Sequence, residues 1–326
     1  LYSFIMKNIK FYTNRFLNLR VSRSDGVAPN KPILLLSVIE MIGLGILHNN
    51  EIPLSGELIA TFLNLWSHLE PIRKPNIGLP FYHLISDGFW HYKMKPGFES
   101  LLTAKVQVRS PQAIRQTVEY AYLDSELWGL LQNAENRSIL TSVLINKWFV
   151  NKSQQIEKLL QVNVFGELEE ELRSQGGKVY DPKELEDDET FIVEQKSIIR
   201  DTAFRKLVVT TYNQTCALCG MKVLDTLSQN IVDGSHIMPF SQFYDDRINN
   251  GISLCKNHHW AFDRFWFSVN DDYTVIVDDK LKEQSPNAKP IREFRGDTII
   301  LPSQSQHYPR LDAIGWHRRE FLERTA

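Results

Sequence analysis

All three cysteines of the chain lie in one short region, where they form part of two knuckles. Two residues separate Cys216 from Cys219, and the same spacing separates Cys255 from His258. This spacing allows a tight turn to direct both side chains at one cation, and Zn²⁺ accepts mixed thiolate and imidazole ligands. Three unrelated buried cysteines are the alternative, but the spacing and the use of every cysteine argue against it. The four residues therefore predict a structural zinc site whose tetrahedral positions are all filled by protein.

A second set of polar residues lies between and just after these ligands. His236 is in a short apolar segment typical of a strand, and Asn250 is in a polar loop that leads into a second apolar strand. His259 and Asp263 are four residues apart in a segment that should form a helix, so we expect them on one face of it. The order of these segments predicts a strand–strand–helix unit that zinc holds together.

This pattern resembles the HNH endonucleases with a ββα-metal fold, in their zinc-knuckle branch, and His236, Asn250 and His259 match the three positions that give the family its name. The resemblance implies that His236 is the general base that takes a proton from the attacking water. It also implies that His259 and Asp263 hold one divalent ion, Mg²⁺, Mn²⁺ or a similar metal, against the scissile phosphate. Asn250 would fix its loop and orient the His236 segment. Phosphodiester hydrolysis needs a positioned nucleophile and a cation that neutralises the charge on the departing oxygen.

Two positions near the base are informative within this resemblance. Many relatives carry an Asp or His ligand directly before the base, where this chain has Ser235, a poor metal ligand. Asp233, three residues before His236, matches an acidic position that is common in the family. It either joins the metal site or orients a neighbouring side chain.

Charge is distributed unevenly along the chain, although the formal net charge is only −2. Residues 1–32 are predominantly basic, whereas acidic residues are dense between Glu167 and Glu194. A chain of 326 residues also exceeds one compact core of ordinary size. We therefore expect three parts, which are a DNA-recognition domain at residues 1–166, an acidic, partly helical and mobile hinge at residues 167–198, and an HNH endonuclease domain at residues 199–326.

The predicted fold class is α+β, with a mainly helical N-terminal DNA-reading domain before the zinc-containing nuclease domain. Apolar spacing indicates three N-terminal helices, at Phe4–Leu19, Ile33–Leu47 and Leu54–Leu69. Asn30 is expected to be the N-cap of the second helix. An Asp-Gly pair within Phe81–Lys93 predicts a hairpin, and helical patterns return from Pro111 to about Leu172.

Two short motifs of the N-terminal part, Asn30-Lys31-Pro32 and Leu79-Pro80-Phe81, resemble the sulfur-binding domains of phosphorothioate-dependent restriction enzymes. The resemblance implies that Asn30 and Lys31 meet the modified phosphate at a helix start, and that Leu79, Pro80 and His83 line the sulfur pocket. A phosphorothioate keeps its negative charge but presents a large, weakly hydrated atom, so its receptor should combine a cation with an apolar wall. The alternative is that Pro80 only fills the core and that Lys31 is a solvated residue.

The residues after Asp263 complete the nuclease domain. The pattern predicts two short strands around a polar turn, at Phe265–Val269 and Asp271–Val277. A further strand is expected within Arg292–Leu301, and an amphipathic helix is expected at Pro309–Arg324.

These features together predict a modification-dependent restriction endonuclease that binds phosphorothioated double-stranded DNA. A nuclease that reads methylated or unmodified DNA, or a non-catalytic zinc-containing DNA-binding protein, remains an alternative. Because one metal site cuts one strand, we expect a homodimer. No apolar run reaches membrane-spanning length, and cysteines committed to zinc fit a reducing cytoplasm.

Overall fold

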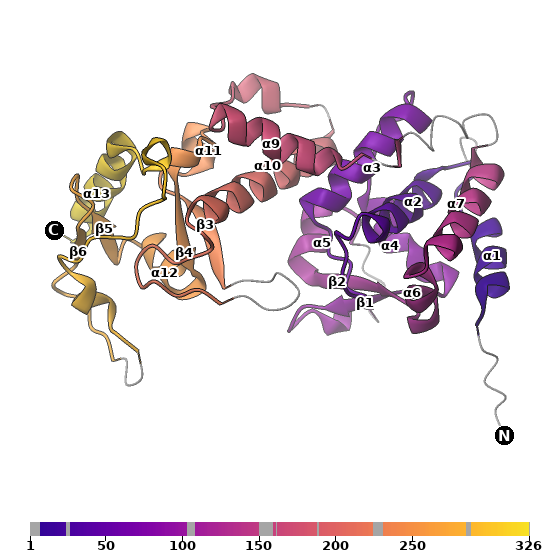
Figure 1. Ribbon diagram of the computed structural model, residues 1–326, viewed down its shortest axis with the longest axis horizontal. Coiled ribbons are helices and arrows are strands. Elements are labelled where there is room, and N and C mark those ends of the chain that lie inside the picture. The colour runs from indigo at the N-terminus through magenta and orange to yellow at the C-terminus, as the bar shows by residue number, and fades with distance from the viewer. Residues whose placement is uncertain are drawn as a thin grey trace. The chain divides into compact units, whose positions relative to one another are not determined.

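The chain divides into two compact units, each with its own core (Figure 1). The computed structural model describes residues 7–23, 27–102, 108–149, 159–160, 162–187, 189–223, 231–284 and 288–325. Unit 1 comprises Leu1–Glu167 and Asp187–Arg200, and unit 2 comprises Leu168–Glu186 and Asp201–Ala326. No helix among the described residues is long and apolar enough to cross a membrane.

Unit 1 packs helices around a two-stranded antiparallel sheet. Its helices are α1 (Ile9–Leu17), α2 (Asn30–Gly43), α3 (Gly56–Leu69), α4 (Gly78–His83), α5 (Pro111–Thr117), α6 (Ser125–Leu131) and α7 (Ala134–Trp148). The sheet pairs β1 (Trp90–Met94) with β2 (Val118–Leu123), with Trp90 opposite Leu123. Helix α2 is the central element, because its apolar residues from Ile33 to Ile42 are almost all buried.

The start of α2 lies one residue from its predicted place. Pro29 occupies the N-cap position and makes no side-chain cap, so Asn30 is the first helical residue instead of the N-cap. Pro32 is tolerated in this first turn because its missing N–H would have no helical partner there. The side chains of Asn30 and Lys31 therefore project from the first turn of a buried helix.

The predicted hairpin within Phe81–Lys93 is wrong. Helix α4 and a 3₁₀ turn at Leu84–Asp87 occupy its first half, and Gly88, with φ of 79°, ends that turn in the left-handed region. The Asp-Gly pair thus serves as a helix terminus, which requires the same glycine conformation as a hairpin turn. The partner of β1 is β2, which lies in a segment predicted to be helical but rich in the aromatic residues that favour strands.

The acidic segment 167–198 is shared between the two units and is more packed than the predicted hinge. It contains most of α9 (Val164–Gln175), a 3₁₀ turn at Pro182–Leu185 and the start of α10 (Thr190–Thr211). Leu172, Ile192 and Ile198 are buried, whereas the acids around them are mainly exposed. Apolar residues at helical spacing therefore determine the packing of this segment despite its charge.

Gln195 shows how closely the segment is bound to unit 1. Its side chain is fully buried, accepts a hydrogen bond from the Ile77 N–H at 2.9 Å, and donates to the Pro75 carbonyl at 3.0 Å. These contacts fix the backbone just before α4.

We expect Gln195→Ala to lower the free energy of unfolding of unit 1 by about 2 kcal/mol, because two buried backbone groups lose their partners. Lys196→Ala is the matched control, since that side chain is 52% exposed and its ion pair with Asp187 is long, at 3.5 Å. Urea unfolding followed by tryptophan fluorescence measures both variants. Equal stability of the two variants would contradict the assigned role of Gln195.

The centre of unit 2 is a strand–strand–helix motif. The C-terminal part of α10 and further elements surround this motif. β3 (Val232–His236) pairs antiparallel with β4 (Gly251–Cys255), which leads directly into α12 (Lys256–Phe262). The short helix α11 (Phe240–Phe243) and a 3₁₀ turn (Ile248–Asn250) lie in the loop between the strands. Helix α10 approaches the strands closely, since a Cβ on Gly234 would lie 2.8 Å from the Arg205 backbone.

The remaining elements of unit 2 agree with the sequence patterns except at one place. β5 (Phe267–Val269) pairs with β6 (Val275–Val277), and α13 (Leu311–Thr325) is the predicted C-terminal helix. The strand predicted within Arg292–Leu301 is absent from the described structure of that segment. It forms a 3₁₀ turn at Ile291–Phe294 and a single bridge between Thr298 and Thr274, because Gly296 has a positive φ that interrupts an extended run.

Candidate active site and recognition pocket

The four predicted zinc ligands meet in space. The ligand atoms of Cys216, Cys219, Cys255 and His258 all lie within 4.8 Å of one another, and they form the one cluster of this kind among the residues described. His258 Nδ1 is 3.2 Å from the Cys255 sulfur and 3.5 Å from the Cys216 sulfur. Hydrogen bonds among the three thiols hold the pKa of Cys255 below its usual value and the pKa of Cys216 above it, so a bound cation would be needed to keep both as thiolates. Three thiolates and one imidazole are a donor set that fits a closed tetrahedral zinc site.

Loss of one ligand should destabilise unit 2, because metal binding contributes directly to folding. We expect Cys216→Ser, or a strong chelator added to the unaltered chain, to lower the unfolding temperature of unit 2 by about 10 °C or more. Scanning calorimetry together with a metal assay measures this. The chelator should have no further effect on Cys216→Ser, and an unchanged unfolding temperature in both cases would contradict a structural metal.

His236, His259 and Asp263 line one cavity of about 380 Å³ in unit 2, whereas Asn250, the third predicted catalytic residue, does not line it. His236 comes from the end of β3, and His259 and Asp263 come from α12 and the residue that follows it. Helix α10 contributes Arg205, and α13 contributes Glu320 and Arg324; Ser235, Ile237, Pro239, Phe240, Gln242, Phe262, Phe265, Trp316 and His317 complete the lining. Residues far apart in the sequence therefore share one polar cleft.

The imidazole of His236 is fixed by a hydrogen bond at its edge and by ring stacking on one face. Its Nε2 donates a hydrogen bond to Asp246 at 2.7 Å, and its ring stacks on Phe204 of α10 with centroids 3.7 Å apart. Only 11% of the His236 side chain and 4% of the Asp246 side chain are exposed. Because Nε2 contacts Asp246, Nδ1 is the ring nitrogen that could accept a proton.

Asn250 is fully buried and connects the ends of the loop between β3 and β4. Its amide nitrogen donates to the carbonyls of Met238 and Asp245, at 3.1 and 2.9 Å, and its oxygen accepts from the Met238 N–H at 3.0 Å. All three bonds are to backbone, so Asn250 orients the loop and does not reach the cleft.

His259 lies between two carboxylates. Its Nδ1 is 3.5 Å from Asp233 and its Nε2 is 3.5 Å from Asp263. Burial opposes ionisation of Asp233, but His259, Arg205 and Lys256 outweigh it and hold the pKa of this carboxyl below its usual value. Asp233 is thereby bound to three partners and orients them. His259 Nε2 and Asp263 could supply two donors for a divalent ion, whose other positions would be filled by water or phosphate oxygens, as is usual for Mg²⁺.

His317, a buried histidine of α13, packs against the end of α12. The His317 ring of α13 stacks on Phe262 at 3.7 Å, and its nitrogens contact the Ser268 hydroxyl at 2.8 Å and the Phe262 carbonyl at 3.1 Å. Burial lowers the pKa of His317 from 6.5 to about 4. The neutral ring is therefore the form that the fold requires.

Stability of unit 2 should depend on this titration. Because the folded pKa is depressed, the unfolded state binds the proton first, so stability is complete above pH 6.5 and falls as the pH drops toward 4, by about 3 kcal/mol in total. His317→Phe should remove most of this slope while keeping the stacking on Phe262. Urea unfolding at several pH values measures it, with the exposed His48→Phe as control; an unchanged slope in His317→Phe would refute the assignment.

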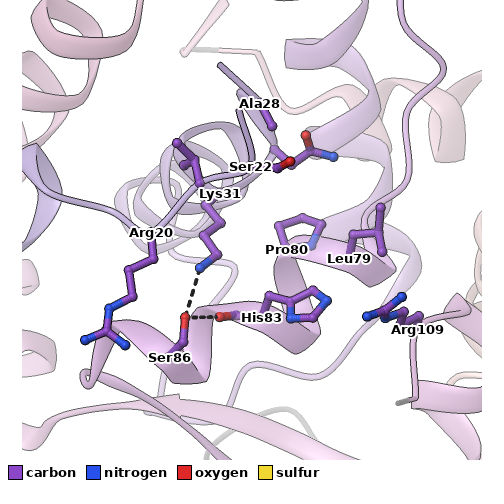
Figure 2. A pocket seen from close by; sticks show the side chains of 11 residues that line it. Arg20, Ser22, Ala28, Lys31, Leu79, Pro80, His83, Ser86 and Arg109 are labelled. Atoms are coloured by element: carbon purple, nitrogen blue, oxygen red, sulfur yellow. Dashed lines mark hydrogen bonds between the residues drawn. The ribbon is translucent and has the colours of Figure 1, made fainter. Parts of the chain in front are cut away.

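The five residues predicted to bind the sulfur line a second cavity, of about 460 Å³, in unit 1 (Figure 2). Asn30 and Lys31 come from the first turn of α2, and Leu79, Pro80 and His83 come from α4. The other lining residues are Arg20, Val21, Ser22, Ala28, Ser86 and Arg109. Residues of two sequence motifs that are separated by almost fifty residues of chain therefore line one cavity.

Lys31 is not a free cation at this pocket. Its ammonium group forms a 2.6 Å ion pair with Asp87 and a 3.2 Å hydrogen bond with Ser86, and the side chains of both charged partners are more than 90% buried. Asp87 also accepts from the Arg20 N–H at 2.8 Å. The pair thus joins the start of α2 to the turn after α4, and its charges largely cancel.

The positive charge exposed at this pocket comes from two arginines. Arg20 and Arg109 are exposed, and their guanidinium groups make no contact with an acid among the residues described. Gly78 allows α4 to approach the Arg109 backbone, because a Cβ there would lie 2.1 Å from the Arg109 carbonyl oxygen. Burial and the charges of Arg109 and Lys31 hold the pKa of His83 below its usual value, so the ring is neutral at neutral pH.

The sequence-based assignment of site residues lacks several residues of these sites, and Asp87, Asp246, Arg20 and Arg109 are examples. Asp87 and Asp246 are short acids in turn-rich segments, and Arg20 and Arg109 are single basic residues. None of them follows a spacing rule, because each acts through a tertiary contact. One general rule applies: a Lys or His that is buried in the fold needs an acidic partner, but the rule does not say which acid it is.

Comparison with known proteins supports the class of the site in unit 2. Residues 216–270 match the family model of the HNH endonucleases, and this stretch holds all four predicted zinc ligands together with His236, Asn250, His259 and Asp263. Residues 216–270 are thus an HNH endonuclease domain.

A solved structure described as a modification-dependent TagI restriction endonuclease is similar to part of the chain. Sequence identity is 23%, the TM-score is 0.28, and the match covers 37% of this chain and 38% of that chain. The match spans well under half of that protein, and a TM-score this low does not establish a shared fold. No curated protein matches the chain.

Proposed function

We propose that the protein is a modification-dependent DNA restriction endonuclease that binds a phosphorothioate in unit 1 and hydrolyses a phosphodiester bond in unit 2. The observation that carries this proposal is the pocket of unit 1. Residues of two motifs that resemble sulfur-binding domains line one cavity, and the same chain contains an HNH endonuclease domain. A helical domain with no binding function would not require these five side chains to line one cavity.

The pocket has the two surfaces that a phosphorothioate needs. Leu79 and Pro80 supply an apolar wall for the weakly hydrated sulfur, and a neutral His83 adds a soft ring edge. Arg20 and Arg109 supply charge for the remaining phosphate oxygens, since guanidinium groups bind phosphate in a forked geometry. Lys31 would then act mainly by fixing the pocket through Asp87, with Asn30 at the rim as a hydrogen-bonding group.

The cleft of unit 2 supports hydrolysis by a single-metal HNH mechanism. The Nδ1 atom of His236 would take the proton of a water that attacks the phosphorus, and the bond to the 3′ oxygen would break as the new bond forms. His259 and Asp263 would hold a divalent ion such as Mg²⁺ or Mn²⁺, which would neutralise the charge on the departing oxygen. Arg205 and Arg324 line the same cleft, where they would contact the phosphate. One such cleft per chain cuts one strand, so a homodimer would cut both.

The decisive experiment compares two duplexes of identical sequence, one of which carries a phosphorothioate in its natural stereochemistry. With Mg²⁺ or Mn²⁺ present, we expect cleavage of the marked duplex alone. His236→Ala should abolish cleavage and leave DNA binding intact, because it removes only the base. Equal cleavage of both duplexes would retain the nuclease and reject the sulfur pocket; binding without cleavage under any metal would favour a non-catalytic DNA-binding protein.

The pocket itself is best tested at Arg109. Arg109→Ala should weaken binding of the marked duplex roughly 10-fold, as expected for the loss of a charged hydrogen-bond donor to phosphate, while the unfolding temperature stays the same. Arg115→Ala is the matched control, since Arg115 is equally exposed on α5 but does not line the pocket. Lys31→Ala is less informative, because it would leave the buried Asp87 without its partner and destabilise unit 1. Equal binding by Arg109→Ala and Arg115→Ala would refute the role of Arg109.

A further inference from the structure

Part of the acidic segment 167–198 lies alongside the loop between β3 and β4 in unit 2. Residues 176–180 run antiparallel to residues 244–248, and Val179 and Asp245 form a β-bridge. The backbone hydrogen bonds are Tyr180 N–H to Tyr244 O at 2.8 Å, Asp246 N–H to Lys178 O at 2.9 Å, and Ile248 N–H to Gly176 O at 3.0 Å. We call residues 176–180 the connector strand. It lies outside the family match at residues 216–270, yet it bonds to the loop within that match.

The contact between the connector strand and Asp246 is close enough to require a glycine. Gly177 has a φ of +82°, and a Cβ at this position would lie 2.3 Å from the Asp246 carbonyl oxygen and 2.7 Å from the Arg247 Cα. Both neighbours are backbone atoms, which cannot move aside as a flexible side chain can. Gly176 next to it also has a positive φ, of +73°, but a Cβ added there would have no neighbour within 4 Å.

Asp246 is the residue that holds the edge of the His236 ring. Its backbone is bound by Lys178 of the connector strand, and its carboxylate accepts the Nε2 proton of His236 at 2.7 Å. Displacement of the Asp246 backbone would therefore move the carboxylate from the imidazole. Phe204 fixes only the plane of the ring by stacking, so it cannot replace this hydrogen bond.

We propose that Asp246 is a positioning residue for the catalytic base and that the connector strand sets its place. A carboxylate at Nε2 selects the tautomer with its proton on that nitrogen, so the lone pair on Nδ1 faces the substrate water. When Nδ1 takes the proton of that water, the same carboxylate stabilises the imidazolium that results. This inference rests on the proposed function, since it assumes that His236 is the base.

The two adjacent glycines provide a matched test. Gly177→Ala and Gly176→Ala introduce similar backbone strain, but only Gly177→Ala collides with Asp246. At saturating substrate, we expect Gly177→Ala to reduce the cleavage rate on the duplex cut by the unaltered protein by roughly 10-fold or more. Gly176→Ala should stay within about 2-fold, and KM for DNA should be unchanged in both. Equal rates of the two variants would overturn the role of the connector strand.

Asp246→Asn tests the carboxylate without changing its size. We expect a loss of roughly 10²-fold or more in kcat with KM and unfolding temperature unchanged, and partial recovery in Asp246→Glu, which restores a carboxylate. His236→Ala separates the two levels of the argument. Cleavage by His236→Ala would reject the proposed function itself. Inactive His236→Ala together with fully active Asp246→Asn would reject only the positioning role of Asp246.

Discussion

The cluster of Cys216, Cys219, Cys255 and His258 is the constraint on which the nuclease site depends. It joins the turn after α10 to the end of β4 and to the first turn of α12, which follows β4 directly. Cys255 lies opposite Val232 at the start of β3, and His258 directly precedes His259. His236 pairs with Gly251, which is four residues before the ligand Cys255. A structural metal at this point would therefore fix β3 and α12, which carry His236 and His259.

Buried acids perform the same task in both candidate sites. Asp87 holds Lys31, and Asp246 holds His236, each through a hydrogen bond shorter than 2.8 Å between side chains that are almost fully buried. Such pairs contribute little net stability, because desolvation offsets much of their attraction, but they allow one geometry only. Asp233 extends the pattern, since it contacts Arg205, Lys256 and His259 together. Each site thus uses a buried acid to fix the position of a basic side chain.

Local patterns determine how much of this arrangement the sequence predicts. The knuckle spacing, the order of β3, β4 and α12, and the C-terminal helix α13 follow from short-range rules, and the structure contains them. The Asp87-Gly88 pair misleads because a helix terminus and a hairpin turn require the same glycine conformation. Arg109 and Asp246 are not predictable from spacing, since their positions result from α4 and the connector strand packing against distant backbone. Which acid pairs with which base is a tertiary property.

The functional unit is accordingly larger than the motif that identifies it. Residues 216–270 contain the candidate metal ligands and the proposed base, but Phe204 and Arg205 of α10, the connector strand, and His317 of α13 all lie outside this range. Each contacts a residue of the motif and restricts its conformation. Because α10 also contributes Gln195 to the packing of unit 1, one helix carries a residue that fixes the backbone before α4 and a residue that stacks on His236, the proposed base. A chain cut down to the motif would keep its ligands but lose the contacts that orient them.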